Sequence, residues 1–461
     1  MTEDMTETTV STISRITDGF FPESKEPSSQ KQNQNKYFLA SRIPHFPTRA
    51  KHVVFLFMNG APSQIDTFDY KPALSRFDGT AYQGDLTVGS NGRPIGYLMQ
   101  TPFSFRSQGE SGLKISSLYP HLSQYADDLC ILRSMHTDTA AHASGCLQMN
   151  TGSVLLGKPC LGSWLSYGLG TMNNSLPSFV VMTDPRGGPI SGASNWTAGY
   201  MPAPYQGTLF RSRGTPILDL ATPAPYSPRS QRQALNLLKS LNDKHLQSRQ
   251  DESELIARIN SYELAYRMQT SASEAVDLGR ENKSTLDMYG LNNELTVDFG
   301  RKCLITRRLL ERGVRFVQLY HYTWDDHSNL NEKLKNNCLM TERGVAALIK
   351  DLKQRGLFEE TLVVWGGEFG RTPMAQGNGR DHHIMGFSMW MAGAGIKNGF
   401  SWGATDDFGY QAVENVVSVH DLHATLLHLL GVKHKQLTYR FQGRDYRLTD
   451  VHGKVIHNIL S

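Results

Sequence analysis

Cysteine is scarce in this chain, and its spacing excludes two common kinds of site. Only 5 cysteines occur among 461 residues, and no C-x-x-C pair is present. A disulfide framework or a zinc site made of thiolates would need paired or closely spaced cysteines. Neither is expected, and the thiols are interpreted as reduced. They are Cys130, Cys146, Cys160, Cys303 and Cys338.

Long apolar runs and a strong charge bias are also missing. No uninterrupted apolar stretch has the length that a membrane-spanning helix needs. The acidic, threonine-rich N-terminus lacks the basic and apolar regions of a signal peptide, so a cytoplasmic location is the default expectation and export stays open. Lysine and arginine number 47 against 43 aspartate and glutamate residues. This near balance argues against nucleic acid or an anionic membrane as a partner.

What is present is the composition of an ordinary globular protein with a polar N-terminal segment. Apolar residues make up 39% of the chain and charged residues 20%, and 461 residues can bury a sizeable core. Residues 1–44 are interpreted as a disordered or extended tail, because residues 22–36 are polar and aperiodic. Residues 45–461 are expected to form a single domain.

Short runs of β-forming residues alternate with helical patterns along this domain. The run from Val53 to Met58 is apolar at every position, which is typical of a strand buried on both faces of a parallel sheet. Residues 344–355 place apolar side chains on one helical face and are followed by Gly356. This alternation predicts an α/β fold, a three-layer α/β/α sandwich with a mostly parallel central sheet. Further strands are expected at 129–132, 179–182, 314–320, 361–365 and 387–391.

One segment departs from the alternation. Residues 229–285 favour helix, with Leu255, Ile259, Tyr262 and Tyr266 at helical spacing and no strand pattern between them. The segment is interpreted as a helical insertion packed on the sheet and not as a second domain.

Imidazole and carboxylate side chains lie beside three of the predicted strands. In open α/β sheets, ligands bind beyond the carboxyl ends of the strands, so these side chains are expected to meet at one edge. Imidazole with carboxylate suits Zn²⁺, Mn²⁺ or iron and lacks the all-oxygen character of a calcium cage. Each group alone would also fit a solvated turn or a simple ion pair, but their coincidence at strand ends favours a metal site. The predicted metal ligands are Asp325, His327, Glu368, Asp381, His382 and His383.

A second set of candidates follows the first strand and the strand expected at 129–132. Residues 133–142 hold hydroxyls, a carboxylate and two histidines, which are the materials of an activated nucleophile. The same residues suit a hydroxyl-rich turn with Asp138 or Thr139 as the N-cap of the next helix, and both interpretations stay open. An arginine could neutralise a bound oxyanion. The catalytic candidates are Thr139, His142 and His136, and the candidates for substrate binding are Arg371, Arg380, Asn59 and Ser63.

Residues 418–431 contain three histidines, yet their pattern favours a structural role. Leucines recur at helical spacing through this segment, Asp421 is expected as the N-cap, and Gly431 is expected to end the helix. A core-facing leucine stripe explains the segment without a ligand.

Seven segments of the chain carry a family resemblance. They are HFPTRAKHVVFLFMNGAPSQIDTFDYKP, LGSWLSYGLG, LPSFVVM, ERGVRFVQLYH with the following WDDH, VVWGGEFGRTP, GRDHH with the following FSMWMAGAG, and VHDLHATLLHLLG. Together they resemble a bacterial group of sulfatase-like proteins known as domain of unknown function 1501, within the alkaline phosphatase/sulfatase superfamily. The resemblance covers residues 45–461 and is specific for the group, but not for a reaction.

The superfamily resemblance implies an alkaline-phosphatase-like sandwich that binds one or two divalent metal ions, with Zn, Mn and Ca as the candidates. It also implies a hydroxyl or modified cysteine nucleophile that attacks a phosphate or sulfate ester. Glu368 stands where the superfamily has a metal-binding Asp. His382 or His383 matches its metal-binding His, and Asp325 with His327 resembles its Asp and His pair.

The chain also departs from the superfamily pattern. Asn59 stands where an Asp is usual, and Phe369 stands where a His or Asn is usual. No C-x-P-S-R motif occurs, so the formylglycine nucleophile of sulfatases is absent, and the sulfatase alignment places His142 at that position. Alignment with the phosphatase pattern T-D-S-A-A nominates Thr139 instead.

These observations predict a metal-dependent hydrolase of phosphate or sulfate esters that acts on a small-molecule or glycan ester. The alternative is a catalytically silent member that keeps a metal and binds a polyanion such as a sulfated glycan. The missing C-x-P-S-R motif and Asn59 favour the alternative, and the retained metal-ligand types favour the enzyme. The oligomeric state does not follow from the sequence.

Overall fold

A nine-stranded sheet forms the centre of the protein. The computed structural model describes residues 39–84, 96–214, 217, 222, 225–247 and 253–461. The middle strand, β1 (His52–Asn59), is buried at every position. It pairs in parallel with β7 (Phe316–Tyr322) on one side and β8 (Thr361–Gly366) on the other. The three buried parallel strands predicted from apolar runs are therefore confirmed.

The sheet continues in both directions from this parallel centre. Two strands, β5 and β6, extend it in parallel beyond β7. Beyond β8, strand β11 runs antiparallel to both of its neighbours, β8 and β4, and β12 and β15 lie parallel to β4. The sheet is thus mostly parallel, as predicted. These strands are β4 (Leu129–His136), β5 (Phe179–Met182), β6 (Thr208–Leu209), β11 (Phe387–Gly393), β12 (Phe400–Trp402) and β15 (Val417–Ser418).

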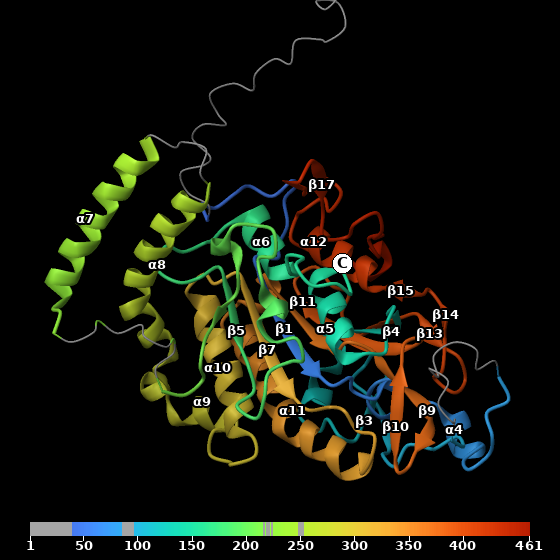
Figure 1. The fold of residues 1–461 in the computed structure, drawn as a ribbon. Coiled ribbons are helices and arrows are strands. Elements are labelled where there is room, and N and C mark those ends of the chain that lie inside the picture. The colour runs from blue at the N-terminus through green and yellow to red at the C-terminus, as the bar shows by residue number, and fades with distance from the viewer. Residues whose placement is uncertain (1–38, 85–95, 215–216, 218–221, 223–224, 248–252) are drawn as a thin grey trace, which may run out of the picture. The chain divides into compact units, whose positions relative to one another are not determined.

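Helices cover both faces of the sheet (Figure 1). The even-numbered apolar residues of β1 pack into one core cluster with α10 and α11. The odd-numbered apolar residues pack into a second cluster with α5, α6 and α12. Two cores on opposite faces make a three-layer α/β/α arrangement, which confirms the predicted fold class. The covering helices are α5 (His142–Thr151), α6 (Leu161–Leu169), α10 (Val297–Glu311), α11 (Leu330–Gln354) and α12 (Val419–Leu429).

The segment predicted to be helical between 229 and 285 forms α7 (Pro228–Gln247), α8 (Ser253–Val276) and α9 (Lys283–Met288). The C-terminal half of α8 packs its buried alanines and a methionine into the same core cluster as α10. Helix α7 lies beside α8, where Arg232 pairs with Glu263 at 2.8 Å. The segment therefore packs on the helical layer that covers the sheet.

Two helix starts differ from the sequence prediction. Helix α11 begins at Leu330, well before the predicted residue 344. Helix α12 has Ser418 as its N-cap and not Asp421. The Ser418 hydroxyl accepts a hydrogen bond from the Asp421 backbone N–H at 3.1 Å, and Asp421 Oδ2 accepts one from the Ser418 N–H at 3.0 Å. This reciprocal capping box places Asp421 in the first helical turn, which corrects the expected N-cap.

Shorter elements connect this framework. The hairpins are β2 (Phe105–Gln108) with β3 (Leu113–Ser116), β9 (Gly370–Gln376) with β10 (Gly379–His383), β13 (Ala404–Thr405) with β14 (Ala412–Glu414), and β16 (Tyr439–Phe441) with β17 (Arg444–Tyr446). The short helices are α3 (Gln64–Thr67), α4 (Pro72–Arg76), η1 (Leu122–Asp128), η2 (Gly192–Trp196), η3 (Ala203–Tyr205), η4 (Leu278–Arg280), η5 (Phe358–Glu360) and η6 (His457–Ile459).

The expected tail at residues 1–44 lies mostly outside the described residues. Its last part, residues 39–44, is described and hydrogen-bonds to the end of α6, where the Arg42 N–H donates to the Leu169 carbonyl at 3.0 Å. Across the part of the chain with described coordinates, no helix is long and apolar enough to cross a membrane.

Candidate metal centre

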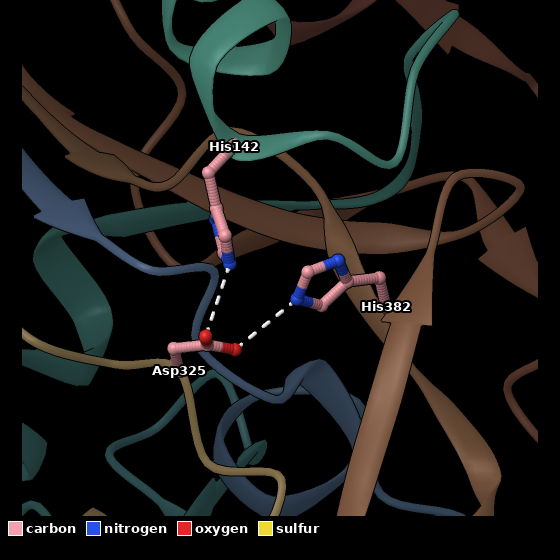
Figure 2. A group of neighbouring side chains, drawn as sticks. All are labelled: His142, Asp325 and His382. Carbon is pink, nitrogen blue, oxygen red and sulfur yellow. Dashed lines mark hydrogen bonds and ion pairs between the residues drawn. The ribbon is translucent and has the colours of Figure 1, made fainter. Parts of the chain in front are cut away.

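Loops from several strands meet at the edge of the sheet where β1, β7 and β8 end. Asp325 and His327 follow β7, and Glu368 follows β8. His382 lies on β10, and His142 is the first residue of α5. Figure 2 shows the rings of His142 and His382 directed at the Asp325 carboxylate from different segments. The structure therefore brings Asp325, His327 and His382 together and adds His142 to them.

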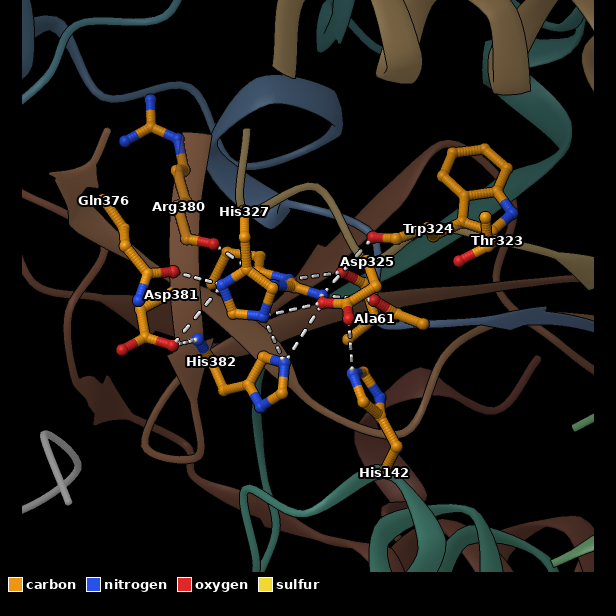
Figure 3. Close-up of polar contacts among 12 residues, drawn as sticks. Ala61, His142, Thr323, Trp324, Asp325, His327, Gln376, Arg380, Asp381 and His382 are labelled. Carbon is orange, nitrogen blue, oxygen red and sulfur yellow. Dashed lines mark hydrogen bonds and ion pairs between the residues drawn. The ribbon is translucent and has the colours of Figure 1, made fainter. Parts of the chain in front are cut away.

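Three side chains form a tight triangle at the centre of this site (Figure 3). His327 Nε2 lies 2.9 Å from Asp325 Oδ1 and 2.9 Å from His382 Nε2, and His382 Nε2 lies 3.1 Å from Asp325 Oδ1. Ligand atoms around a tetrahedral Zn²⁺ with bonds of about 2.0–2.1 Å lie roughly 3.3 Å apart. The three atoms are thus spaced much as ligands of one ion would be.

His142 approaches Asp325 from α5 and is held from behind by Glu368. Its Nδ1 lies 2.6 Å from Glu368 Oε1, which also accepts a hydrogen bond from the Gly60 N–H at 2.9 Å. Its Nε2 lies 3.3 Å from Asp325 Oδ2, but this buried nitrogen has no aligned hydrogen-bond partner among the described residues. Glu368 is fully buried, so its charge and the His142 ring are held in a fixed relation.

The partners of the Nδ1 atoms decide where the lone pairs point. His382 Nδ1 lies 2.7 Å from the Ala140 carbonyl, which can only accept, so Nδ1 must carry the proton. His142 Nδ1 faces a carboxylate, with the same consequence. In the neutral form of each ring, Nε2 then carries a lone pair that faces Asp325; in His142, whose pKa is raised to about 9, an ion would have to displace the second proton. This is the orientation that a ligating histidine adopts when its other nitrogen is held by a protein acceptor.

Electrostatics at the site favour a cation. Burial lowers the pKa of His382, which keeps that ring neutral. Burial alone would lower the pKa of His142, but the carboxylates of Asp325 and Glu368 outweigh it and raise the pKa to about 9. Burial alone would raise the pKa of Asp325, but His142, His382 and Arg371 hold it well below its usual range. The pocket thus holds buried negative charge that attracts a proton or another cation.

A second set of possible ligand atoms shares His382. His327, Asp381 and His382 also place ligand atoms within 4.8 Å of one another. His327 Nδ1 lies 3.6 Å from Asp381 Oδ1 and hydrogen-bonds the Gln376 amide oxygen. The ligand atoms of another group, His142, Asp325 and His382, also lie within 4.8 Å of one another. The arrangement provides donors for one ion and a possible neighbouring position for a second.

Two of the six predicted ligands lie in different surroundings. His383 is buried and its Nε2 donates to the Tyr410 carbonyl at 2.5 Å, so the ring points away from Asp325. The neighbouring positions 382 and 383 face opposite sides because successive residues of a strand alternate. Glu368 reaches the cluster through His142, and its Oε2 has no hydrogen-bond partner among the described groups.

The two arginines expected to bind an oxyanion are occupied by protein groups. Arg371 is buried, and its guanidinium donates to the carbonyls of Ala61 and Arg380 at 3.0 and 3.1 Å and to Asp325 Oδ1 at 2.6 Å. Arg380 is buried with Asp66, with an Nε to Oδ2 distance of 2.7 Å. Arg371 therefore fixes Asp325, and Arg380 ties β10 to helix α3.

The remaining candidates lie around the cluster or away from it. The Asn59 amide oxygen is 3.3 Å from Cys146 Sγ, and Ser63 donates to Asp66 at 2.5 Å. Thr139 accepts a hydrogen bond from the Ala141 N–H at 3.2 Å, which makes it part of the turn before α5. His136 ends β4 and lines a separate groove.

Other residues that build the site were not predicted. Phe369 packs against the rings of His142 and His382, with centroid distances of 4.9 and 4.7 Å. Gly60 has φ +111°, and a Cβ there would lie 2.5 Å from the Trp324 nitrogen, so only glycine lets these loops approach. The Asn-Gly pair after the first strand was the available signal for this contact. Phe369 was noted in the sequence only as a departure from the superfamily pattern, and its contact with the two rings was not predicted.

The donor set fits a divalent transition metal. It combines bare imidazole nitrogens with the Asp325 carboxylate, and the buried nitrogen of His142 and buried oxygen of Glu368 lack hydrogen-bond partners among the described atoms. Imidazole and carboxylate donors are typical of zinc, manganese and iron sites. An ion bound to the imidazole nitrogens would also remove the contact between two ring nitrogens at 2.9 Å.

The fold and this cluster together define an α/β protein with a candidate metal centre. Residues 50–460 match the family described as "Protein of unknown function (DUF1501)", and the chain belongs to that family. This match confirms the predicted family, domain of unknown function 1501, and by itself assigns no sulfatase-like activity. No curated protein sequence matches the chain at a significant level.

Solved structures with partial likeness include a synthase, a sulfatase and a phosphonate monoester hydrolase. The lipoteichoic acid synthase LtaP from Listeria monocytogenes is 9% identical, with 88% of this chain and 78% of that chain covered at a TM-score of 0.37. The PsFucS1 sulfatase from Pseudoalteromonas sp. is 13% identical, with 88% and 72% covered at 0.34. The phosphonate monoester hydrolase SpPMH from Silicibacter pomeroyi is 12% identical, with 68% of each chain covered at 0.34.

Proposed function

We propose that this protein is a metal-dependent hydrolase of phosphate or sulfate esters. The observation that carries the proposal is the convergence of His142, His327 and His382 on Asp325, with the Nδ1 atoms of His142 and His382 held by protein acceptors. Histidines restrained in this way cost little further ordering when they bind an ion. The sequence motifs that resemble the alkaline phosphatase/sulfatase superfamily support the same assignment.

Each residue of the cluster has a role in this proposal. Asp325, His142, His327 and His382 would hold the ion, and Asp381 would hold a second ion if one binds. A bound divalent ion would polarise an ester oxygen and lower the pKa of a water or hydroxyl. Glu368 is a positioning residue that fixes the tautomer of His142, and Arg371 fixes the orientation of the Asp325 carboxylate.

Thr139 is the candidate nucleophile in this proposal. Thr139 lies one residue before Ala140, whose carbonyl contacts His382, so its hydroxyl is carried on a segment that borders the cluster. A threonine hydroxyl needs a neighbouring base or metal to become a nucleophile. Cys146 is an unsuitable alternative, because burial raises the pKa of its thiol far above the usual value.

One observation favours a second candidate function, a catalytically silent member that binds a polyanion. Arg371 and Arg380 donate to protein oxygens and are almost fully buried, so neither guanidinium is available to bind an ester oxyanion. A hydrolase would have to stabilise the charge of its reacting group with the ion or with other cations.

Metal content and turnover measured on the full-length protein test the proposal. The purified protein is loaded with Zn²⁺ or Mn²⁺, and its metal content is determined by mass spectrometry. Aryl phosphates, phosphodiesters and aryl sulfates are then offered as substrates. We expect about one or two ions per chain and turnover of at least one ester class that a chelator abolishes.

Variants separate the enzyme from the silent member. His327→Ala should lose both metal and turnover, whereas His457→Ala, at an exposed histidine away from the cluster, should keep both. Full metal content without turnover of any ester supports the silent member. A wild-type protein that binds neither metal refutes the metal centre itself.

A further inference from the structure

A second cavity opens near the carboxyl end of β4. It has a volume of about 660 Å³ and lies between the end of β4, the start of α12 and the chain around residues 447–454. We call it the β4–α12 groove. Its lining includes six basic side chains: His136, His420, Lys435, Arg447, His452 and Lys454.

Three of these basic side chains stand outside any ion pair among the described residues. In the described part of the chain, Lys435, Arg447 and Lys454 form no ion pair with a carboxylate, and both lysines are exposed. Arg447 uses its Nε to donate to the Asp450 backbone carbonyl, which fixes the side chain without cancelling its charge. The groove therefore combines three cations outside any described ion pair with two carboxylates, and it keeps a net positive charge.

Its two carboxylates are occupied by backbone and amide donors. Asp421 accepts hydrogen bonds from the N–H groups of Ser418 at 3.0 Å and Lys454 at 2.6 Å. Asp138 accepts one from the Gln148 amide. These contacts anchor the walls of the groove and leave the ammonium groups unpaired.

The histidines of the groove are held in place as well. His420 Nε2 lies 2.9 Å from the Gly152 carbonyl, and its ring centroid lies 5.1 Å from that of His452. His136 ends β4 and borders the same space. The His420 N–H is thus used by the protein, and the ammonium and guanidinium groups are the donors that suit a multiply charged oxyanion.

The groove and the metal centre are joined by one short segment. His136 lines the groove, and His142 lies in the cluster with Asp325. Between them, the Ala140 carbonyl contacts His382 at 2.7 Å. A ligand long enough to follow this segment could therefore occupy both places.

We propose that the β4–α12 groove binds a sulfate or phosphate group of a substrate that carries more than one such group. This inference rests on the proposed function, because it assigns the second anion to the molecule whose ester bond lies at the metal centre. The groove supplies the cationic recognition that the saturated Arg371 and Arg380 do not. The substrate class is accordingly a molecule that bears at least two sulfate or phosphate groups.

Binding of small anionic probes tests the groove directly. Isothermal titration calorimetry of the full-length protein at low salt uses a heparin-derived disaccharide, inorganic sulfate and inorganic phosphate. The double variant Lys435→Gln/Lys454→Gln should raise the Kd for the disaccharide at least tenfold, because it removes two exposed cations without burying a new group. Lys350→Gln is the matched control, since Lys350 is an exposed lysine that lines a cavity on α11.

The source of the anion follows from the probes. Tighter binding of the disaccharide and sulfate than of phosphate assigns a sulfated ligand, and the reverse order assigns a phosphorylated one. An unchanged Kd in the double variant, or an equal change in Lys350→Gln, would refute the proposal that the groove binds the anionic group.

A chelated sample separates this inference from the proposed function. The groove lies outside the metal ligands, so probe binding that depends on Lys435 and Lys454 should persist in the chelated protein and in His382→Ala. Loss of metal binding with groove binding intact refutes the metal centre alone. Probe binding lost in His382→Ala but unchanged in the double lysine variant refutes the groove alone.

Discussion

Two histidine-rich regions of this protein differ in what their rings contact. In the metal cluster, His142 and His382 use Nδ1 to contact an acceptor and direct Nε2 at Asp325. On α12, His423 uses Nε2 to donate to the Met149 carbonyl, and the ring is fully buried. The same residue type is therefore placed for ligation in one region and for packing in the other, and the difference lies in where the second nitrogen points.

Among the substitutions, we expect the largest effect on metal affinity at His382. His382→Ala should lower metal affinity by at least about a hundredfold, because it removes the residue shared by both sets of ligand atoms. Its melting temperature without metal should fall modestly, since the side chain is only 16% exposed and packs against Phe369. Metal content after dialysis against a weak chelator measures the first effect, and a thermal scan with chelator measures the second.

His423→Ala is the matched test in the other region. It should leave metal content at the wild-type value and lower the free energy of unfolding by about 2–3 kcal/mol, because it opens a cavity and leaves the Met149 carbonyl without its donor. Loss of metal from His423→Ala at a pH where it stays folded would contradict the division between the two regions.

The stability of the α12 region should also depend on pH. Burial lowers the pKa of His423 from 6.5 to about 4. The unfolded chain binds this proton more readily, so the contribution is fully present above pH 6.5 and is lost as the pH falls from 6.5 towards 4. The lost free energy at pH 4.5 is about 2–3 kcal/mol, at about 1.4 kcal/mol per pKa unit.

Urea unfolding of the wild type and His423→Asn at pH 7.5 and 4.5 measures the pH-dependent contribution of His423 to the free energy of unfolding. Asparagine keeps a donor but does not titrate in this range, so the variant should lose less stability between the two pH values. An identical pH dependence in both proteins would show that His423 is not the titrating group.

A further prediction concerns Glu368, which contacts His142 in the candidate metal centre. Glu368→Gln keeps the shape of the side chain but weakens its hold on His142 Nδ1, so metal affinity should fall about 10–100-fold. Competition with a chromogenic chelator measures this change. An affinity equal to that of the wild type would mean that His142 needs no carboxylate behind it, and would remove Glu368 from the site.

The smallest expected effect concerns the helix cap of α12. Ser418→Ala removes the hydroxyl that accepts the Asp421 N–H and should cost about 1 kcal/mol of stability, with metal content unchanged. Ser418→Asp restores an acceptor and should recover most of that loss. Chemical denaturation of the three proteins gives the values, and a loss in Ser418→Ala near zero would argue against the capping box.

Much of the site was accessible from local patterns. The strand β1 was predicted because six consecutive apolar residues, rich in β-forming types, suit a strand buried on both faces. The positions of Asp325, His327 and His382 followed from the rule that ligands gather beyond strand ends. Both inferences need no long-range information, because a run or a strand end is a property of nearby residues.

Other parts depend on contacts between distant segments. His142 was predicted as a catalytic residue, and its approach to Asp325 depends on Glu368, which lies 226 residues further along the chain. Arg371 and Arg380 looked available for an oxyanion until the fold placed protein oxygens around them. His136 was assigned to the catalytic segment, whereas the structure places it at the β4–α12 groove.

By itself, the sequence determined the α/β class, the family and the chemical types gathered at one edge of the sheet. Apolar periodicity and strand-end residues carry this information because they arise from local backbone geometry. The tertiary structure alone decided which ring nitrogen faces Asp325, which arginines are consumed by the fold, and which cations remain free in the groove. Those outcomes depend on the direction of side chains from different layers, and a direction in space is set only when the layers pack.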